Sequence, residues 1–258
     1  MTARREPLRL VSVLTRRDDE PGEGAATLAR YAAAGHEVMV VTCTGDATGG
    51  DGVSEVLGAG HHRLGYAAFG RPGGTSFASV PVAEPTERLV RVLREFRPHV
   101  VVAHDDTADP GPDRVRCREV SVAAFDAAGD AARFPGAGEA WQPGKLYTVH
   151  EWSEARMRAL HEALLARDLE SPYRDWLAAP SPGTRWITTR VPCGEFFPVR
   201  DRVLRAYAGF LAPAVRHRLA VPVHVRQAVW PTEDFELARC HVPTSLPEDD
   251  LLAGISPQ

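Results

Sequence analysis

The sequence predicts a single α/β domain built on a Rossmann-like, mostly parallel sheet with helices on both faces. Short, continuous apolar segments alternate with helical patterns through the first half of the chain, which is typical of buried parallel strands joined by crossover helices. The chain has 258 residues, of which 44% are apolar and 25% are charged, and this fits one large domain with a sizeable core. The sequence shows no internal repeat.

Three apolar segments in the first half predict buried strands. They cover residues 8–14 (LRLVSVL), 36–44 (HEVMVVTCT) and 99–104 (HVVVAH). Each is short and bounded by helical or loop patterns, as expected for a parallel strand that is covered on both faces. A fourth strand-like segment covers residues 145–152.

Helical patterns separate these strands. The clearest spans residues 85–97, because Leu89, Val92, Leu93 and Phe96 recur with helical spacing before Pro98 stops the helix. Further helices are predicted at 22–35, 114–128 and 154–169, and a short one at 233–239. The glycine-rich segment 45–60 is predicted to be a flexible connection. We expect one domain over residues 1–258, with the part from about residue 184 forming an attached lobe.

Composition and charge exclude several classes of protein. The formal net charge of -4 gives no electrostatic case for binding nucleic acid. No segment is long and apolar enough to span a membrane, and no apolar signal-peptide stretch follows the charged first residues. The four cysteines form no C-x-x-C pair, so we expect reduced, mostly buried thiols and a cytoplasmic location.

Two acidic loops follow predicted strands. In a parallel sheet, ligands bind beyond the carboxyl ends of the strands. The first loop reads Thr-Arg-Arg-Asp-Asp-Glu over residues 15–20, and its three adjacent carboxylates call for a compensating metal or guanidinium group. The alternative is a solvated acidic turn that leads into a helix. The second loop, residues 104–114, is also acidic, so the two loops predict a shared pocket.

Two histidines near this pocket are candidates for chemistry. His104 ends the third predicted strand, and His150 lies on the fourth. Histidine titrates near neutrality, so His150 could act as a base without a metal. For each residue, a hydrogen-bonded structural role is the ordinary alternative.

Several segments of the chain together resemble one family. They are 18–20 (DDE), 24–27 (GAAT), 40–45 (VVTCTG), 84–99, 120–125 (VSVAAF), 230–239 (WPTEDFELAR) and 246–251 (LPEDDL). They resemble the mycothiol S-conjugate amidases of the LmbE-like (PIG-L type) N-deacetylase superfamily, nearly from end to end. The segments near the end of the chain resemble those of the amidase branch.

The resemblance implies a first loop of the form His-Pro-Asp-Asp-Glu. In the family its histidine and second aspartate bind zinc, and its first aspartate is the general base on the metal-bound water. Here Asp18 stands at the base position and Asp19 at the ligand position. Arg16 and Arg17 replace the histidine and the proline.

The resemblance implies a second loop of the form His-Pro-Asp-His, whose last histidine is the third zinc ligand. Here residues 111–114 read Gly-Pro-Asp-Arg. Arg114 stands at the ligand position and Gly111 at the position of the histidine that stabilises the oxyanion, while Asp113 is retained. The segment after the glycine-rich turn, residues 46–60, is also shorter than in the family.

These replacements predict that zinc does not bind in the family's manner and that no cofactor is required. Arginine is always protonated and has no lone pair to donate, so Asp19 is the only retained ligand position. We expect Asp18, His104, Asp113 and His150 to be the catalytic candidates. Arg16, Arg17 and Arg114 are expected to bind substrate through their positive charge. A rebuilt metal site from Asp19, His104, Asp105, Asp106 and Asp113 is the alternative.

Three functions follow. The first is a homologue with a degenerate metal site, repurposed for zinc-independent chemistry or for binding a polar or anionic small molecule in specialised (natural-product) metabolism. The second is an amide hydrolase that acts on a thiol conjugate or amino-sugar amide with a nonstandard cation. The third is a non-catalytic subunit. The expected partner is a small molecule, and a second copy or an active homologue stays open.

Overall fold

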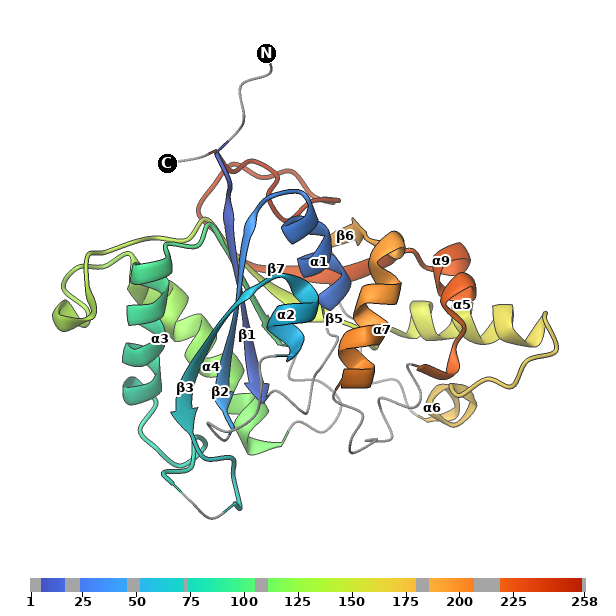
Figure 1. Cartoon of the computed structure of the whole chain (residues 1–258), viewed down its shortest axis with the longest axis horizontal. Helices are drawn as coiled ribbons and strands as arrows, with labels where there is room; N and C mark the ends of the chain where they lie inside the picture. The colour runs from blue at the N-terminus through green and yellow to red at the C-terminus, as the bar shows by residue number, and fades with distance from the viewer. Residues whose placement is uncertain are drawn as a thin grey trace.

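The computed structural model describes residues 6–16, 24–45, 52–71, 74–104, 111–179, 186–206 and 219–256. Seven strands in these ranges form one sheet in the order β3-β2-β1-β4-β5-β7-β6. The sheet runs through the middle of the molecule, with helices on both sides (Figure 1). The predicted architecture is therefore confirmed.

The first five strands of the chain are parallel to one another, and the last two join them in the opposite direction. Neighbours β3, β2, β1, β4 and β5 pair in parallel, whereas β7 pairs antiparallel with both β5 and β6. The strands predicted near residues 8, 36, 99 and 145 are confirmed as β1, β2, β4 and β5. The bounds are β1 Arg9–Arg16, β2 Glu37–Thr44, β3 Gly60–Tyr66, β4 Val100–His104, β5 Lys145–His150, β6 Thr189–Pro192 and β7 Thr232–Cys240.

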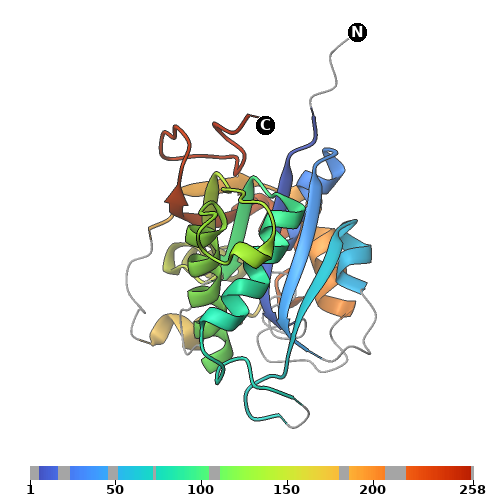
Figure 2. The same cartoon turned by 90° about the vertical axis from the view of Figure 1, so that its left-hand side faces the viewer.

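The helices form two layers. On one face, α3 and α4 cover the sheet, and on the other lie α1, α2 and α7 (Figure 2). Further along the chain, α5 packs against α6 and α9. The bounds are α1 Ala25–Ala33, α2 Gly52–Leu57, α3 Ala83–Phe96, α4 Pro112–Ala128, α5 Glu154–Leu165, α6 Arg174–Ala178, α7 Phe197–Ala206 and α9 Val223–Val229, with short 3-10 turns at Pro135–Ala137 and Gly194–Phe196.

Alternate residues of each strand feed the two cores that the sheet separates. In β4, Val101 and Ala103 join the core beneath α3 and α4, whereas Val100 and Val102 join the core beneath α1 and α7. This is the period of two that an extended backbone imposes. All four side chains are nearly or fully buried, which explains why the segment reads as a continuous apolar run.

Two predictions of local structure are wrong. Residues 233–239, predicted as a short helix, lie in β7, because pairing with β5 and β6 on its two sides holds this segment extended. In the segment 45–60, predicted to be a flexible connection, residues 52–57 form α2, which packs against α7, while residues 46–51 lie outside the described residues. The part of the chain after residue 184 supplies β6 and β7 to the common sheet.

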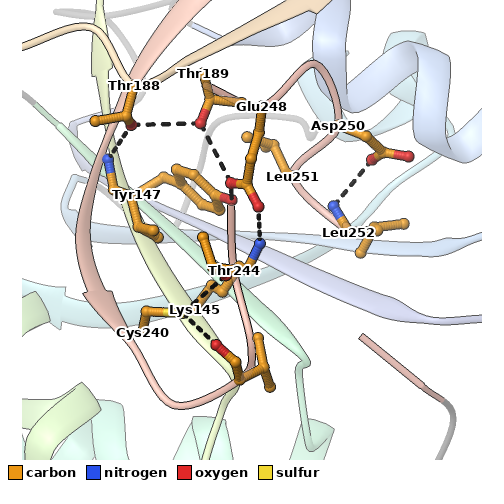
Figure 3. Close-up of polar contacts among 12 residues, drawn as sticks. Lys145, Tyr147, Thr188, Thr189, Cys240, Thr244, Glu248, Asp250, Leu251 and Leu252 are labelled. Atoms are coloured by element: carbon orange, nitrogen blue, oxygen red, sulfur yellow. Dashed lines mark hydrogen bonds and ion pairs between the residues drawn. The ribbon is translucent and has the colours of Figure 1, made fainter. Parts of the chain in front are cut away.

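The segment after β7 returns to the sheet and is attached to β5 by a buried carboxylate (Figure 3). Lys145 Nζ donates to Glu248 Oε1 in an ion pair whose side chains are 0% and 4% exposed. Tyr147 Oη donates to Glu248 Oε2 at 2.6 Å. Nearby, Tyr31 Oη donates to Asp250 at 2.6 Å, which attaches the same segment to α1. Within the described ranges, no helix is long and apolar enough to cross a membrane.

Candidate functional site

The carboxyl ends of the parallel strands meet at one edge of the sheet. β1 ends at Arg16, β4 at His104 and β5 at His150. Because β7 runs in the opposite direction, its first residues reach the same edge, where Asp234 pairs with His150. The candidate site is therefore built from both halves of the chain, at the place where parallel sheets bind ligands.

Much of the first acidic loop lies outside the described residues. This holds for Arg17, Asp18 and Asp19, and of Arg16 only the backbone at the end of β1 is described. Residues 105–110 of the second loop also lie outside them. The described ends of the two loops are the first turns of α1 and α4.

Asp113 lies in the first turn of α4 and is 9% exposed. Its Oδ2 accepts a hydrogen bond of 2.7 Å from the backbone N–H of Phe69. Its Oδ1 is buried and has no hydrogen-bond partner among the described residues. A carboxylate at a helix N-terminus is stabilised by the helix dipole. Asp113 therefore holds the segment after β3 against α4, and its second carboxylate oxygen has no partner within the described ranges.

Arg114 follows in the same helical turn and is partly exposed. Its backbone N–H donates to the carbonyl of Gly111 at 2.9 Å. Arg114 takes part in a further interaction. A guanidinium here adds to the positive end of the helix dipole, so the start of α4 favours anions.

The two candidate histidines lie on opposite faces of the sheet. His104 pairs in register with Val149, which belongs to the core beneath α1 and α7. His150 alternates with Val149 and so belongs to the α4 face. Both side chains are buried, at 1% and 2% exposure. His150 Nε2 lies 3.1 Å from Glu236 Oε2, and this carboxylate is positioned to orient the ring.

The start of β7 brings to this edge buried carboxylates that the sequence argument did not single out. Glu233 is fully buried and accepts from the backbone N–H groups of Ala26 at 3.3 Å and Thr27 at 2.8 Å. It thereby caps α1, the helix that follows the first acidic loop. Burial raises the pKa of Glu233, while the positive charge of Arg200 acts in the opposite direction.

The Trp-Pro-Thr-Glu-Asp motif at residues 230–234 now has a structural explanation. Trp230 Nε1 donates to Asp234 Oδ2 at 2.9 Å, and Thr232 Oγ1 donates to Asp234 Oδ1 at 2.8 Å. These bonds hold the turn that precedes β7 and set Glu233 against α1. The sequence identifies this motif only through its resemblance to the family, whereas the contact by which Glu233 caps α1 is seen in the structure.

Among the residues that the structure describes, no three His, Cys, Asp or Glu side chains gather to hold a metal ion. His104, Asp113 and His150 come from three different elements at one edge, but the sheet separates His104 from His150. The structure thus brings Asp113, Arg114 and His150 to one face of the sheet edge.

The comparisons with known proteins give two relatives of nearly the same length. The chain is 38% identical to the mycothiol S-conjugate amidase of Streptomyces coelicolor, across 97% of this chain and 98% of the relative. It is 33% identical to 1D-myo-inositol 2-acetamido-2-deoxy-alpha-D-glucopyranoside deacetylase 1 of Frankia alni, across 93% and 98%. No model of a protein family matches the chain.

Two solved structures share the fold. A conserved protein from Thermus thermophilus aligns with a TM-score of 0.62 and 23% identity, across 92% of this chain and 97% of its own. The N,N'-diacetylchitobiose deacetylase from Pyrococcus horikoshii aligns with a TM-score of 0.60 and 12% identity, across 90% and 84%. At these identities the likeness concerns the fold.

Proposed function

Since this chain belongs to the LmbE-like deacetylase superfamily, in the group of the mycothiol S-conjugate amidases and the related inositol-glycoside deacetylases, we propose that it hydrolyses an amide bond in a small polar molecule. The substrate class is a thiol conjugate or an amino-sugar amide. The observation that carries this proposal is the likeness to an amidase across nearly the whole of both chains, combined with the retained carboxylates of Asp18, Asp19 and Asp113.

The residues at the two family loops do not fit a zinc ion bound in the family's manner. Two of the three expected ligand positions hold Arg16 and Arg114, whose guanidinium groups have no lone pair and would repel a dication. A catalytic zinc normally has three protein ligands and a water. No step of the proposed reaction therefore uses zinc, and any cation held by the remaining carboxylates would be a nonstandard one.

The retained residues supply the functions that hydrolysis of an amide needs. Asp18 stands at the position of the general base and would take the proton of the attacking water. Arg16, Arg17 and Arg114 would orient the substrate and stabilise the negative charge that develops on the carbonyl oxygen. The position of Arg114 at the positive end of α4 supports this role.

His150 is the second candidate for the base. Its contact with Glu236 fixes the ring, as a carboxylate does in many acid–base pairs. Both assignments have an energetic cost, because water without a Lewis acid keeps a pKa of about 15.7 rather than about 7. Since each 1.36 kcal/mol changes a rate about tenfold, we expect slow turnover unless the arginines supply several kcal/mol.

A second candidate function is binding without hydrolysis. Two cationic side chains at positions where the family has neutral ligands favour a polar or anionic small molecule, such as an intermediate of a specialised (natural-product) pathway. The same loops would serve both functions, and the difference lies in whether the amide bond is broken.

Mass spectrometry of a panel of amides tests the proposal. Purified protein that has not been exposed to a chelator is incubated with a mycothiol S-conjugate and with an N-acetylglucosaminyl inositol. The metal content of the same preparation is measured. We expect amine release that Asp18→Asn lowers by about a hundredfold or more and that Arg114→Gln also lowers. Arg118→Gln, one turn further along α4 and exposed, is the matched control. Binding without release by the wild type would reject hydrolysis in favour of the second function.

A further inference from the structure

Three arginines from three different helices are buried together beside the sheet edge. Arg156 lies on α5, Arg200 on α7 and Arg226 on α9, and their exposures are 4%, 2% and 2%. α9 packs against both other helices (Figure 1). Charged side chains are almost never buried this completely unless they are paired.

The three guanidinium groups lie within electrostatic range of one another and of Tyr173. The charges of Arg156 and Arg226 lower the pKa of Arg200, with burial as the largest cause. Burial raises the pKa of Tyr173, and all three arginines act on the same hydroxyl in the opposite direction. Two of the guanidinium carbons also lie over the ring of Phe197, at 4.7 Å for Arg200 and 5.8 Å for Arg226.

Five guanidinium nitrogens in this cluster have no acceptor among the described residues. They are Nε and Nη1 of Arg156, Nε of Arg200, and Nε and Nη1 of Arg226. A buried donor without a partner costs about 1–3 kcal/mol, and more when it is charged. Five such donors in one place exceed the buried acceptors left open beside them, of which Asp201 Oδ1 is one.

The carboxylates close to the cluster do not satisfy these donors. Asp201 Oδ2 accepts from Arg226 Nη2 at 2.5 Å, while its Oδ1 is 3.9 Å from Arg200 Nε, beyond hydrogen-bonding distance. The oxygens of Glu233 are used by the N–H groups that begin α1. The negative charge of Glu151 acts on Arg200, and the five nitrogens still have no hydrogen-bond acceptor among the described residues.

Another buried arginine in the same chain shows what full satisfaction looks like. Arg94 is 3% exposed, and its three nitrogens donate to six backbone carbonyls of residues 127–138. None of its nitrogens is left open. Arg94 is thus a structural arginine, and the contrast indicates that the cluster of Arg156, Arg200 and Arg226 serves another purpose.

We propose that Arg156, Arg200 and Arg226 form a binding site for a phosphate-type oxyanion at the junction of α5, α7 and α9. A tetrahedral oxyanion offers several acceptor oxygens to guanidinium donors carried by three different helices. The proposal does not depend on whether the chain hydrolyses an amide. Such an anion would tie the three helices together.

Two measurements on the wild-type chain test the proposal. Ion chromatography of the anions released when the purified protein is denatured reports an anion that copurifies. Thermal unfolding of protein refolded in phosphate-free buffer, with inorganic phosphate added at constant ionic strength, reports binding through a saturable rise in the melting temperature. We expect either about one equivalent of released phosphate or a saturable rise in the melting temperature on adding phosphate. No released oxyanion together with no saturable shift would overturn the proposal.

Variants locate the site. Arg226→Gln and Arg156→Gln are each expected to weaken phosphate binding by about tenfold or more. Arg158→Gln and Arg202→Gln, which are exposed and lie two positions from Arg156 and Arg200, are expected to leave it unchanged. Loss of binding in Arg114→Gln with retention in Arg226→Gln would place the anion at α4 and refute the assignment. An equal response to acetate would reject a tetrahedral ligand.

Discussion

Lys145 and Glu248, separated by 103 positions in the chain, form an ion pair in which neither side chain is exposed by more than 4%. Tyr147 donates to the same carboxylate, so two residues of β5 contact one residue of the segment that follows β7. β5 ends at His150, beside the candidate site. The pair therefore supports the strand that carries this histidine.

Removing one member of this pair should destabilise the fold strongly. Glu248→Gln keeps an acceptor for Tyr147 but leaves the Lys145 ammonium buried without its counter-charge. We expect a loss of about 3–5 kcal/mol in the free energy of unfolding, measured with urea. Asp249→Asn, at an exposed neighbouring position, is the control and should change it by less than about 0.5 kcal/mol. A loss below about 1 kcal/mol for Glu248→Gln would contradict a dry, paired lysine.

The buried carboxyl of Glu233 should make stability depend on pH. Burial raises its pKa in the folded chain, so the folded state holds this proton at pH values where the unfolded state has lost it. Its contribution to stability is then fullest below the ordinary pKa of glutamate, about 4.3, and falls as the pH rises towards the folded value. Relative to the wild type, Glu233→Gln should gain stability over that rise, by up to about 1.4 kcal/mol per pH unit.

Paired urea titrations of wild type and Glu233→Gln across the acidic and neutral pH range measure this difference directly. The amide oxygen can accept only one of the two N–H bonds from the first turn of α1, so the charge is read from how the difference changes with pH and not from its absolute size. A difference that stays flat, or that favours the wild type more at higher pH, would show that the arginines outweigh burial at Glu233.

The four cysteines should differ in reactivity. Cys43, Cys117 and Cys193 are buried, and burial raises the pKa of Cys193, whereas Cys240 is exposed. Only the thiolate reacts, so a thiol-specific disulfide reagent at mildly alkaline pH should add one label per native chain. Intact-mass measurement should show that label disappear in Cys240→Ser. Labelling of a second cysteine before unfolding would be incompatible with this burial.

Restoring the family's histidines should restore a metal site if the loops keep their geometry. The triple variant Arg16→His, Gly111→His, Arg114→His is expected to bind about one zinc, with Asp19 completing the set. The matched triple Arg16→Gln, Gly111→Ala, Arg114→Gln removes the same positive charges without adding ligands and should bind none. Elemental analysis of both proteins decides this.

The hydrolytic activity of the histidine-restored protein shows which part of the site limits catalysis. Zinc binding with amide hydrolysis would mean that the loss is confined to these positions. Zinc binding without hydrolysis would assign the fault to the shorter segment 46–60. If no zinc binds, the two loops do not stand in the family's arrangement and the correspondence of Arg16 and Arg114 to the family's ligands is refuted.

The sequence was a good guide where a segment is buried on both sides. Val100 to Ala103 form such a strand, and its apolar run can be recognised without any neighbour. β7 could not be recognised in this way. Glu233 is buried by its contact with α1 and Asp234 by its contact with Trp230, and no local sequence pattern predicts either contact. Pairing across the sheet, rather than local preference, makes this segment a strand.

In the candidate site, too, residues of one continuous motif could be predicted and residues brought together by packing could not. Asp113 and Arg114 follow from a motif in one continuous loop, so the sequence predicts them. The arginines at 156, 200 and 226 sit on three helices whose spacing in the chain carries no signal, and only packing brings them together. Glu236 was likewise not predicted as the partner of His150, because the pairing of β5 with β7 had not been foreseen.

The reversed direction of β7 has a consequence for how the domain would respond to occupancy. Its first residues share an edge with the last residues of β4 and β5, so a ligand seated there would touch segments that are far apart along the chain. Such a ligand would hold these segments together. Its binding should then make the entire domain more resistant to proteolysis, and not only the loops that line the pocket.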